Sequence, residues 1–362
     1  MDNISFPKQK KRIESIDALR AFALFGVIMV HINSMYSFGG VATNDFSYFT
    51  PIGIEIKHII KLLFDDKSRT IFSTLFGISF YLILRNPSYT IGKFCWRCVL
   101  LMCFGLLDKL FSTYDILFWY GLNGLLLAVI PVRKISQKSL LLLSIFLFSF
   151  GVINFLPIIQ FGFPVRYASD TSLIAIMTYP MQKILLMDFY TRLSIDGSMT
   201  LSFFLFGFYL GKKGIIDNID QYTTIKKVGG SVLLFGLAML IYKLSHANLI
   251  AWRLSVLSGA IALSLSFIYL FNYLKKHLLF MVKYGKLGLT NYSTQYIFGT
   301  LMVLYIAIPL RLSIEYVFLL GICLYALQAS FAVFWMKRHR YGPLEWIWRI
   351  ATNRKYESNR FI

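Results

Sequence analysis

Long apolar segments dominate the pattern along the chain, and polar residues gather in the short connections between them. A helix needs about 20 mostly apolar residues to cross a membrane, so segments of roughly 17–25 residues are the signal to look for. The pattern predicts ten spanning helices, of which the sixth is the shortest. Their expected limits are 18–37, 69–85, 94–112, 115–132, 138–157, 198–212, 228–246, 251–273, 287–309 and 313–336. The expected fold class is therefore an all-α polytopic membrane protein.

Composition supports this class and argues against others. The chain has 57% hydrophobic and only 15% charged residues, whereas a soluble domain carries about 25% charged residues. An ordinary soluble enzyme and a disordered chain are both disfavoured. We find no internal repeat, so we expect a basic N-terminus (1–17), one membrane domain (18–336) and a basic tail (337–362).

Basic residues indicate how the helices are oriented. The net charge is +20, and the Lys and Arg residues lie at the ends of apolar segments, where they act as orientation signals and lipid-headgroup partners rather than as a nucleic-acid surface. Placing the N-terminus in the cytoplasm makes the alternate connections basic, and ten spans then return the C-terminus to the same side. Polar residues interrupt the first apolar segment, so we expect it to remain as an uncleaved span.

Two connections on the expected outer side have helical patterns of their own. Residues 52–64 place apolar side chains at helical spacing with charged residues on the other faces, which is typical of an amphipathic helix in the membrane interface. The region 166–193 has a similar mixture of charged and apolar residues. Together these segments could form a roof over an outer cavity.

The first predicted span contains the most informative polar residues. Arg20 and His31 are eleven residues apart, which is about three helical turns, so they share one face and lie roughly 16 Å apart along the axis. Asp17 precedes Arg20 by three residues and can pair with it. This arrangement places an anion-binding group at one depth and a titratable base at another. The alternative is that Arg20 only extends to the membrane surface and that His31 is a packed hydrogen-bonding residue.

Other polar residues within or beside the spans are candidates for binding a substrate or donor. They are Arg69 at one end of the second span, Asp115 and Asn123 at the start of the fourth, and Asn291 and Gln295 early in the ninth. Hydrogen bonds between packed helices would explain the last two equally well.

In the tail, Glu345 and Arg349 are spaced to pair, and the neighbouring tryptophans suggest a short helix anchored at the inner membrane face.

The cysteine and histidine residues do not form a metal-binding pattern. Cys95 and Cys98 make one CxxC, without a second pair or a strand-helix context, so a structural role is expected. The five His residues lack ligand spacing along a helix. We therefore expect no metal site and no permanently bound cofactor.

Four sequence blocks resemble the YeiB family of bacterial membrane proteins: Arg12–Ala21, Phe72–Gly77, Gly285–Tyr292 and Gly342–Arg349. The blocks lie near both ends and in the middle, and the last is the most specific. The YeiB family is similar to a wider group of transmembrane acyltransferases, which includes heparan glucosaminide acetyltransferase and bacterial enzymes that modify surface sugars. This chain departs from the usual patterns at Ala21, His31 and Asp108.

The resemblance implies a functional pair in the first helix, for which Arg20 and His31 have the matching spacing. It also implies acyl transfer from a cytoplasmic acyl-CoA donor to a sugar or lipid-linked glycan at the outer face of a bacterial inner membrane. Then His31 would be the general base, Arg20 would hold the donor, and Asp17 would orient Arg20. A transporter or flippase for an amphiphile is the competing hypothesis, and a purely structural or regulatory membrane protein is a third.

Overall fold

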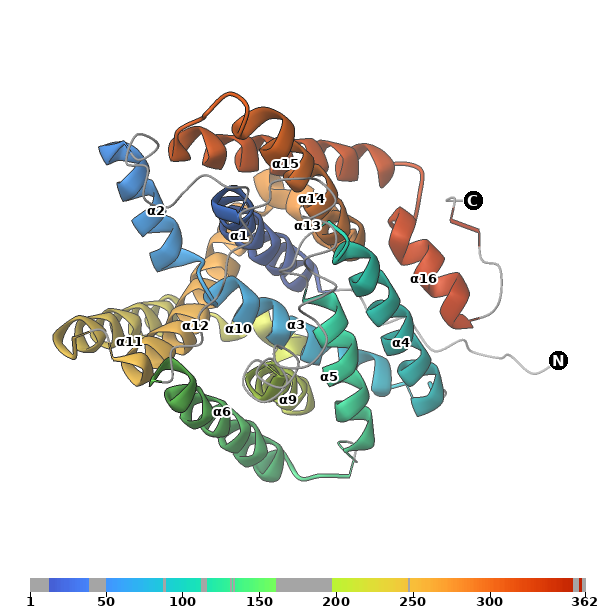
Figure 1. Ribbon diagram of the computed structural model, residues 1–362. Coiled ribbons are helices and arrows are strands. Elements are labelled where there is room, and N and C mark those ends of the chain that lie inside the picture. Colours follow the sequence, from blue (N-terminus) through green and yellow to red (C-terminus); the bar gives the residue numbers. More distant parts are fainter. Residues whose placement is uncertain are drawn as a thin grey trace.

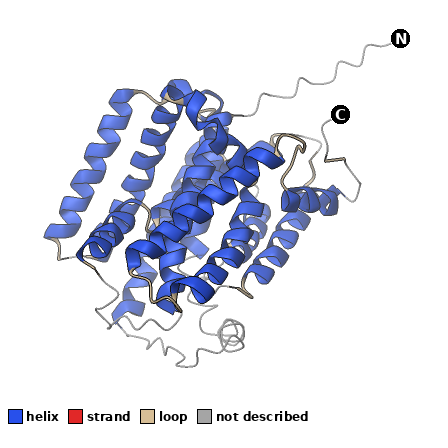
Figure 2. Cartoon of the chain, turned by 90° about the horizontal axis from the view of Figure 1, so that it is seen from above, coloured by secondary structure: helices blue, strands red, loops and turns tan. Residues whose placement is uncertain are grey.

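The computed structural model describes residues 13–38, 50–86, 89–111, 116–130, 132, 134–160, 197–246, 248–353 and 358–359, and side chains of 153–160 are excluded. This described part of the chain contains helices and no strands (Figure 2). The predicted all-α class is therefore confirmed. The helices are α1 (Glu14–Phe38), α2 (Pro51–Leu63), α3 (Lys67–Leu84), α4 (Ile91–Asp108), α5 (Leu117–Val129), α6 (Gln137–Gln160), α9 (Ser198–Lys212), η3 (Ile216–Asn218), α10 (Ile219–Tyr222), α11 (Ile225–Leu244), α12 (Leu249–Tyr273), α13 (Lys275–Lys286), α14 (Gly288–Met302), η4 (Val303–Ala307), α15 (Ile314–Trp335) and α16 (Pro343–Asn353).

Each of the ten predicted spans coincides with a helix to within a few residues, and the ninth corresponds to α14 continued by the π-helical turn η4. Four helices are long and apolar enough to cross a membrane, namely α1, α11, α12 and α15. A fifth span is possible where α9 continues into η3 and α10 with a bend of 66°. These helices indicate a membrane protein. Among the other predicted spans, α5 is shorter, and α4 is more polar because it carries Lys93, Arg97 and Asp108.

Helix α1 lies in the middle of the bundle, with α3, α12, α13, α14 and α15 packed around it (Figure 1). Its small residues explain this position, because Ala18, Ala21 and Ala23 are fully buried and let neighbouring helices approach closely. By contrast, α11 packs mainly on α12 and exposes leucines such as Leu233 and Leu237, as expected for a surface that faces lipid.

Helices α3 and α9 touch backbone to backbone. A Cβ atom added to Gly77 would lie 2.0 Å from the carbonyl oxygen of Phe204, and one added to Gly207 would lie 2.1 Å from that of Thr74. Only glycine fits at such distances. The contact fixes α3, which carries much of the candidate site.

The first predicted interfacial helix is present as α2. Thr50 caps its first turn by accepting a hydrogen bond from Gly53 N, and Pro51 occupies the first helical position, where its missing N–H costs nothing. Ile52 and Ile59 are exposed. The second expected interfacial segment, 166–193, lies outside the described residues.

Candidate functional site

A cavity of about 320 Å³ lies between the start of α1, helices α3, α4 and α5, the α13–α14 junction and α16. Basic side chains line one end, beside α16: Arg20, Arg97, Lys286, Arg340 and Arg349. Aromatic and aliphatic side chains line the other end, among them Phe72, Phe76, Leu101, Leu117 and Tyr120. We call these the basic end and the aromatic end. Such a cavity suits an elongated ligand with an anionic head and an apolar arm.

Arg20 is held in place at the basic end by three groups. Its guanidinium donates to Asp17 Oδ1 at 3.0 Å, to Ser79 Oγ at 3.1 Å and to the carbonyl oxygen of Gly285 at 3.4 Å. The predicted Asp17–Arg20 pair is therefore confirmed. Gly285 permits this arrangement, because a Cβ atom there would lie 1.8 Å from the carbonyl oxygen of Asp17. The result is a preorganised cation, with an orientation fixed by α1, α3 and α13.

The tail helix α16 forms one wall of the basic end. Trp348 Nε1 donates to the carbonyl oxygen of Arg97 at 3.0 Å, and the Arg97 guanidinium lies 3.7 Å from the centre of the Trp348 ring. Trp348 thus points into the protein, whereas the sequence suggested an anchor at the membrane surface. On the same side, Trp96 Nε1 donates to the carbonyl oxygen of Ala351 at 3.0 Å.

Glu345 fastens this wall to the first turn of α14. Its carboxylate accepts from Leu289 N at 2.6 Å, from Thr290 N at 3.0 Å and from Thr290 Oγ1 at 2.6 Å. The sequence suggested pairing with Arg349, but these contacts place the carboxylate at a helix N-terminus, where free N–H groups favour negative charge. Burial raises the pKa of the Glu345 carboxyl, and its hydrogen bonds to Thr290 and Leu289 oppose that rise.

His31 lies beyond the aromatic end of the cavity, where it contacts α14. Its Nε2 atom is 3.5 Å from the hydroxyl of Tyr296, whose oxygen is 2.8 Å from that of Tyr292. The ring of Tyr292 in turn stacks on Phe72, which lines the cavity, with centroids 6.2 Å apart. Two tyrosines therefore separate His31 from the cavity that Arg20 lines.

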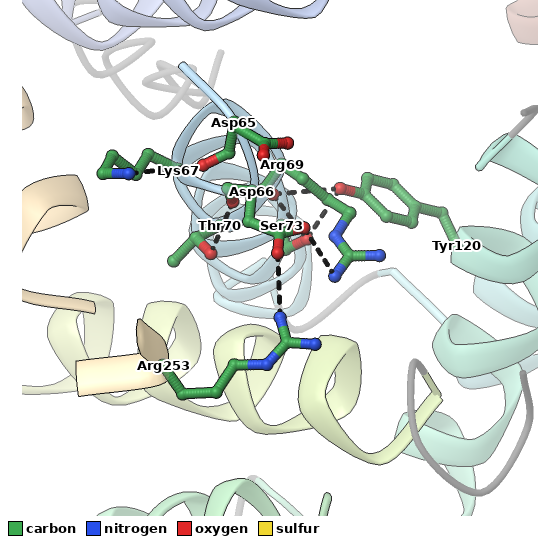
Figure 3. A network of polar contacts seen from close by, with 8 residues as sticks. All are labelled: Asp65, Asp66, Lys67, Arg69, Thr70, Ser73, Tyr120 and Arg253. Atoms are coloured by element: carbon green, nitrogen blue, oxygen red, sulfur yellow. Dashed lines mark hydrogen bonds and ion pairs between the residues drawn. The ribbon is translucent and has the colours of Figure 1, made fainter. Parts of the chain in front are cut away.

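A polar cluster at the start of α3 connects with the same region (Figure 3). Asp66 pairs with Arg69 at 3.1 Å and with Arg253 of α12 at 2.9 Å. Tyr120, at the aromatic end of the cavity, is hydrogen-bonded to Ser73 Oγ at 2.6 Å and donates to the carbonyl oxygen of Arg69 at 3.3 Å. Burial favours the neutral carboxyl of Asp66, but the charges of Arg69 and Arg253 outweigh it and hold its pKa below the ordinary value.

The remaining predicted site residues that the structure describes do not line this cavity. Asn123 is buried and donates to the carbonyl oxygen of Trp119 within its own helix. Asn291 donates to the carbonyl oxygen of Tyr284 and joins α13 to α14. Gln295 is 2% exposed, and within the described residues its amide atoms have no hydrogen-bond partner. Asp115 lies outside the described residues.

Sequence reasoning missed several residues that the fold brings into the cavity, notably Ser79, Lys286 and Arg340. Arg97 gave a signal, since it is a charge inside an apolar segment. Among the described residues, no group of His, Cys, Asp or Glu is placed to hold a metal ion. Cys98 packs against Gly124, where an added Cβ atom would lie 2.7 Å from the sulfur.

Fold and cavity together define a helical membrane protein with an internal amphipathic cavity. Residues 210–355 match a family model described as "Protein of unknown function (DUF418)", which is the YeiB-like family. The matched region includes the α13–α14 junction and α16, and therefore the wall that α16 forms at the basic end of the cavity.

Two uncharacterised proteins are similar over nearly the full length. The chain is 27% identical to an uncharacterised 39.9 kDa protein encoded in an amylase 3′ region of Bacillus acidopullulyticus, over 96% of this chain and 95% of that protein. It is 24% identical to the uncharacterised protein YxaH of Bacillus subtilis (strain 168), over 94% of each chain. No solved structure gives a significant match.

Proposed function

We propose that this protein is a membrane acyltransferase that takes an acyl group from a cytoplasmic acyl-CoA donor and passes it to a sugar or lipid-linked glycan at the outer face. The observation that supports this most directly is the cavity with a basic end around Arg20 and an aromatic end at Phe72 and Tyr120. An acyl-CoA has the matching chemistry, with phosphates at one end and an acyl thioester at the other.

The proposal includes the finer membrane arrangement. Ten helices cross a bacterial inner membrane, both termini are cytoplasmic, and α16 lies on the cytoplasmic side. The basic connections support this orientation, and it places the basic end of the cavity toward the cytoplasm. Membrane lipids surround the bundle, with α2 in the outer interface.

The donor would bind along α3. A planar guanidinium can hold phosphate through two parallel hydrogen bonds, and Arg20 is already oriented by Asp17 and Ser79. From Ile83 to Phe72, both of which line the cavity, α3 rises by about 16 Å. An extended donor arm of that length would bring the thioester from the basic end to the aromatic end, next to Tyr292.

His31 would then act as the general base toward the acceptor. The acceptor oxygen or nitrogen attacks the thioester carbonyl carbon as its proton passes to His31, the new acyl bond forms, and the carbon–sulfur bond breaks, so that CoA leaves as a thiolate. In this proposal Arg69, Asp115, Asn123, Asn291 and Gln295 contribute to binding of the donor or the acceptor.

Turnover by the purified full-length protein, reconstituted in lipid, would test this function. Radiolabelled acyl-CoA is supplied on the cytoplasmic side, and release of CoA and labelling of a glycan or lipid fraction are measured. We expect His31→Ala to lower turnover by at least about 10²-fold, while His58→Ala, on exposed α2, serves as the matched control and keeps it.

Two outcomes would contradict the proposal. If the wild-type protein turns over no acyl-CoA, the enzyme function is wrong, and movement of an amphiphile across the membrane without chemical change would favour a transporter or flippase. If His31→Ala folds and remains fully active, His31 is merely packed and its assignment as base is wrong.

A further inference from the structure

The cations at the basic end of the cavity belong to two walls that different helices form. Arg20 of α1 and Lys286 at the end of α13 form the first, which we call the core wall. Arg97 of α4 and Arg349 of α16 form the second, the tail wall, where α16 packs beside α4 (Figure 1). Among the described residues that line the cavity, Glu345 has the one carboxylate. This excess of positive charge favours a ligand with several negative charges.

The two walls reach the cavity at a similar level. Ser79, which accepts a hydrogen bond from Arg20, precedes Phe80, and the ring of Phe80 lies 4.0 Å from that of Phe94 in α4. Both rings line the cavity, and Arg97 follows Phe94 by three residues, which is less than one helical turn. A ligand beside these two rings therefore lies near Arg20 and Arg97 together.

The contacts that orient the cations are compatible with anion binding. The Arg97 guanidinium lies 3.7 Å from the centre of the Trp348 ring, and this cation–π contact uses its charge but none of its N–H donors. On the core wall, Lys286 adjoins Gly285, whose carbonyl oxygen accepts a hydrogen bond from Arg20. The backbone thus places the Lys286 ammonium group beside the oriented guanidinium of Arg20.

We propose that the basic end is a diphosphate site, in which the core wall binds one phosphate and the tail wall binds the other. Two phosphates joined by one oxygen present anionic oxygens in two directions, so they suit cations on two walls better than a single phosphate does. This inference rests on the proposed function, in which the diphosphate is that of the acyl-CoA donor. The diphosphate of an isoprenoid lipid has the same chemistry, and its apolar arm would also suit the aromatic end.

A bound diphosphate joins the tail helix to the centre of the bundle. It reduces the repulsion between like charges on the two walls and accepts hydrogen bonds from both. Binding of the ligand and docking of α16 are therefore coupled, and each stabilises the other by the same free energy.

The first test measures binding of inorganic pyrophosphate to the full-length protein in lipid and needs no turnover. We expect pyrophosphate to bind about tenfold or more tightly than orthophosphate. Lys286→Gln and Arg97→Gln each remove one cation from one wall. Each should raise Kd for pyrophosphate about tenfold or more, as expected for the loss of a hydrogen bond between charged groups. Melting curves without ligand check that the variants are folded, and Arg349→Gln replaces Arg97→Gln if that variant is not.

Lys283→Gln and Lys93→Gln are the matched controls. Lys283 lies about one turn from Lys286 on α13, and Lys93 lies about one turn from Arg97 on α4, but neither lines the cavity. Both controls should leave Kd unchanged. If controls and cavity variants weaken binding equally, the anion responds only to the overall charge, and the site is overturned. Orthophosphate that binds as tightly as pyrophosphate would overturn it as well.

The second test measures the coupling to α16. Saturating pyrophosphate should slow cleavage by trypsin after Lys337 and Arg338 several-fold in the wild type and in Lys93→Gln. It should slow this cleavage much less in Arg97→Gln, where the tail wall has lost a cation. If pyrophosphate binds to the wild type but does not protect the tail, the tail wall does not bind a phosphate and the two-wall site is wrong.

Competition with CoA and with a short isoprenyl diphosphate separates this inference from the proposed function. Displacement of bound pyrophosphate by CoA supports both. Displacement by the isoprenyl diphosphate alone supports the diphosphate site but contradicts an acyl-CoA donor. A wild type that turns over acyl-CoA without binding pyrophosphate would overturn the diphosphate site and leave the enzyme function standing.

Discussion

The carboxylate of Glu345 accepts hydrogen bonds from both the backbone N–H and the hydroxyl of Thr290, and this relationship ties the tail helix α16 to the first turn of α14. The tail therefore contributes to the cavity wall and is more than a surface appendage. The same contact explains why Glu345 lies partly buried beside several cations, yet makes its hydrogen bonds to a helix N-terminus.

Glu345→Ala should release α16 from α14. The variant leaves Leu289 N–H and Thr290 N–H without their acceptor, which typically costs about 1–3 kcal/mol. We expect a lower Tm and faster cleavage by trypsin after Lys337 and Arg338, just before α16. Glu14→Ala is the control, because the Glu14–Lys275 pair is exposed and should contribute about 1 kcal/mol at most. Equal trypsin sensitivity in the two variants would show that Glu345 does not fasten the tail.

Arg20→Lys should weaken donor binding more than it weakens folding. Lysine keeps the positive charge but cannot bond Asp17, Ser79 and a phosphate with one planar group. A charge-assisted hydrogen bond contributes about 1.5–3 kcal/mol, so Kd for acyl-CoA should rise roughly tenfold to a hundredfold. Isothermal titration with a non-hydrolysable acyl-CoA measures this change. Arg85→Lys, which alters an exposed pair with Asp217, is the control and should leave Kd unchanged. Equal Kd values for the two variants would show that Arg20 does not bind the donor.

The helices could be predicted because the signal for a spanning helix is local. Each predicted limit depends on one run of apolar residues, and α1 or α12 ends where that run ends. The pairing of Asp17 with Arg20 could be predicted for the same reason, since three residues along a helix bring two side chains together.

The cavity could not be predicted in this way. Its basic end combines Arg20, Arg97, Lys286 and Arg349, which are far apart in the sequence and meet only through packing. Likewise, Glu345 and Arg349 have the spacing of an ion pair, but the nearby N-terminus of α14 offers three donors to the carboxylate. The contact between Tyr292 and Tyr296 could be predicted from their four-residue spacing. The contact between Tyr296 and His31 could not, because the two residues are far apart in the sequence.

Gly77→Ala should destabilise the contact between α3 and α9. The new methyl group would meet the carbonyl oxygen of Phe204 at 2.0 Å, so the helices must separate. Overpacking of this kind usually costs about 1–3 kcal/mol, and we expect a lower Tm in a fluorescence-detected melt. Gly236→Ala is the matched control, because a Cβ atom there has open space and alanine favours a helix by up to about 1 kcal/mol. A Tm for Gly77→Ala at or above that of the control would mean that α3 and α9 are not in backbone contact.

Reporter fusions test the proposed orientation of the ten spans. Fusions after residues 90, 135, 220 and 280 should be active in the cytoplasm, because the connections there are basic. Fusions near residues 160 and 248 should report the outer side. A difference confined to 158–198 would revise the short sixth span alone, whereas inversion at several positions would refute the topology.

Acidification should remove the stabilising effect of Asp66. Its pKa is held below the ordinary value of 3.8, because the pull of Arg69 and Arg253 exceeds the opposing effect of burial. A depressed carboxyl pKa stabilises the folded state above 3.8, and this contribution is lost as the pH falls through the folded-state pKa. Asp66→Asn should therefore lower Tm clearly at pH 7, where it leaves buried Arg253 without this carboxylate. The Tm difference between wild type and Asp66→Asn should shrink as the pH falls below about 4.

Asp217→Asn, in the exposed pair with Arg85, should have a small effect at pH 7. If the Asp66→Asn difference is the same at pH 7 and pH 3, the ion pairs of Asp66 do not stabilise the junction of α3 and α12.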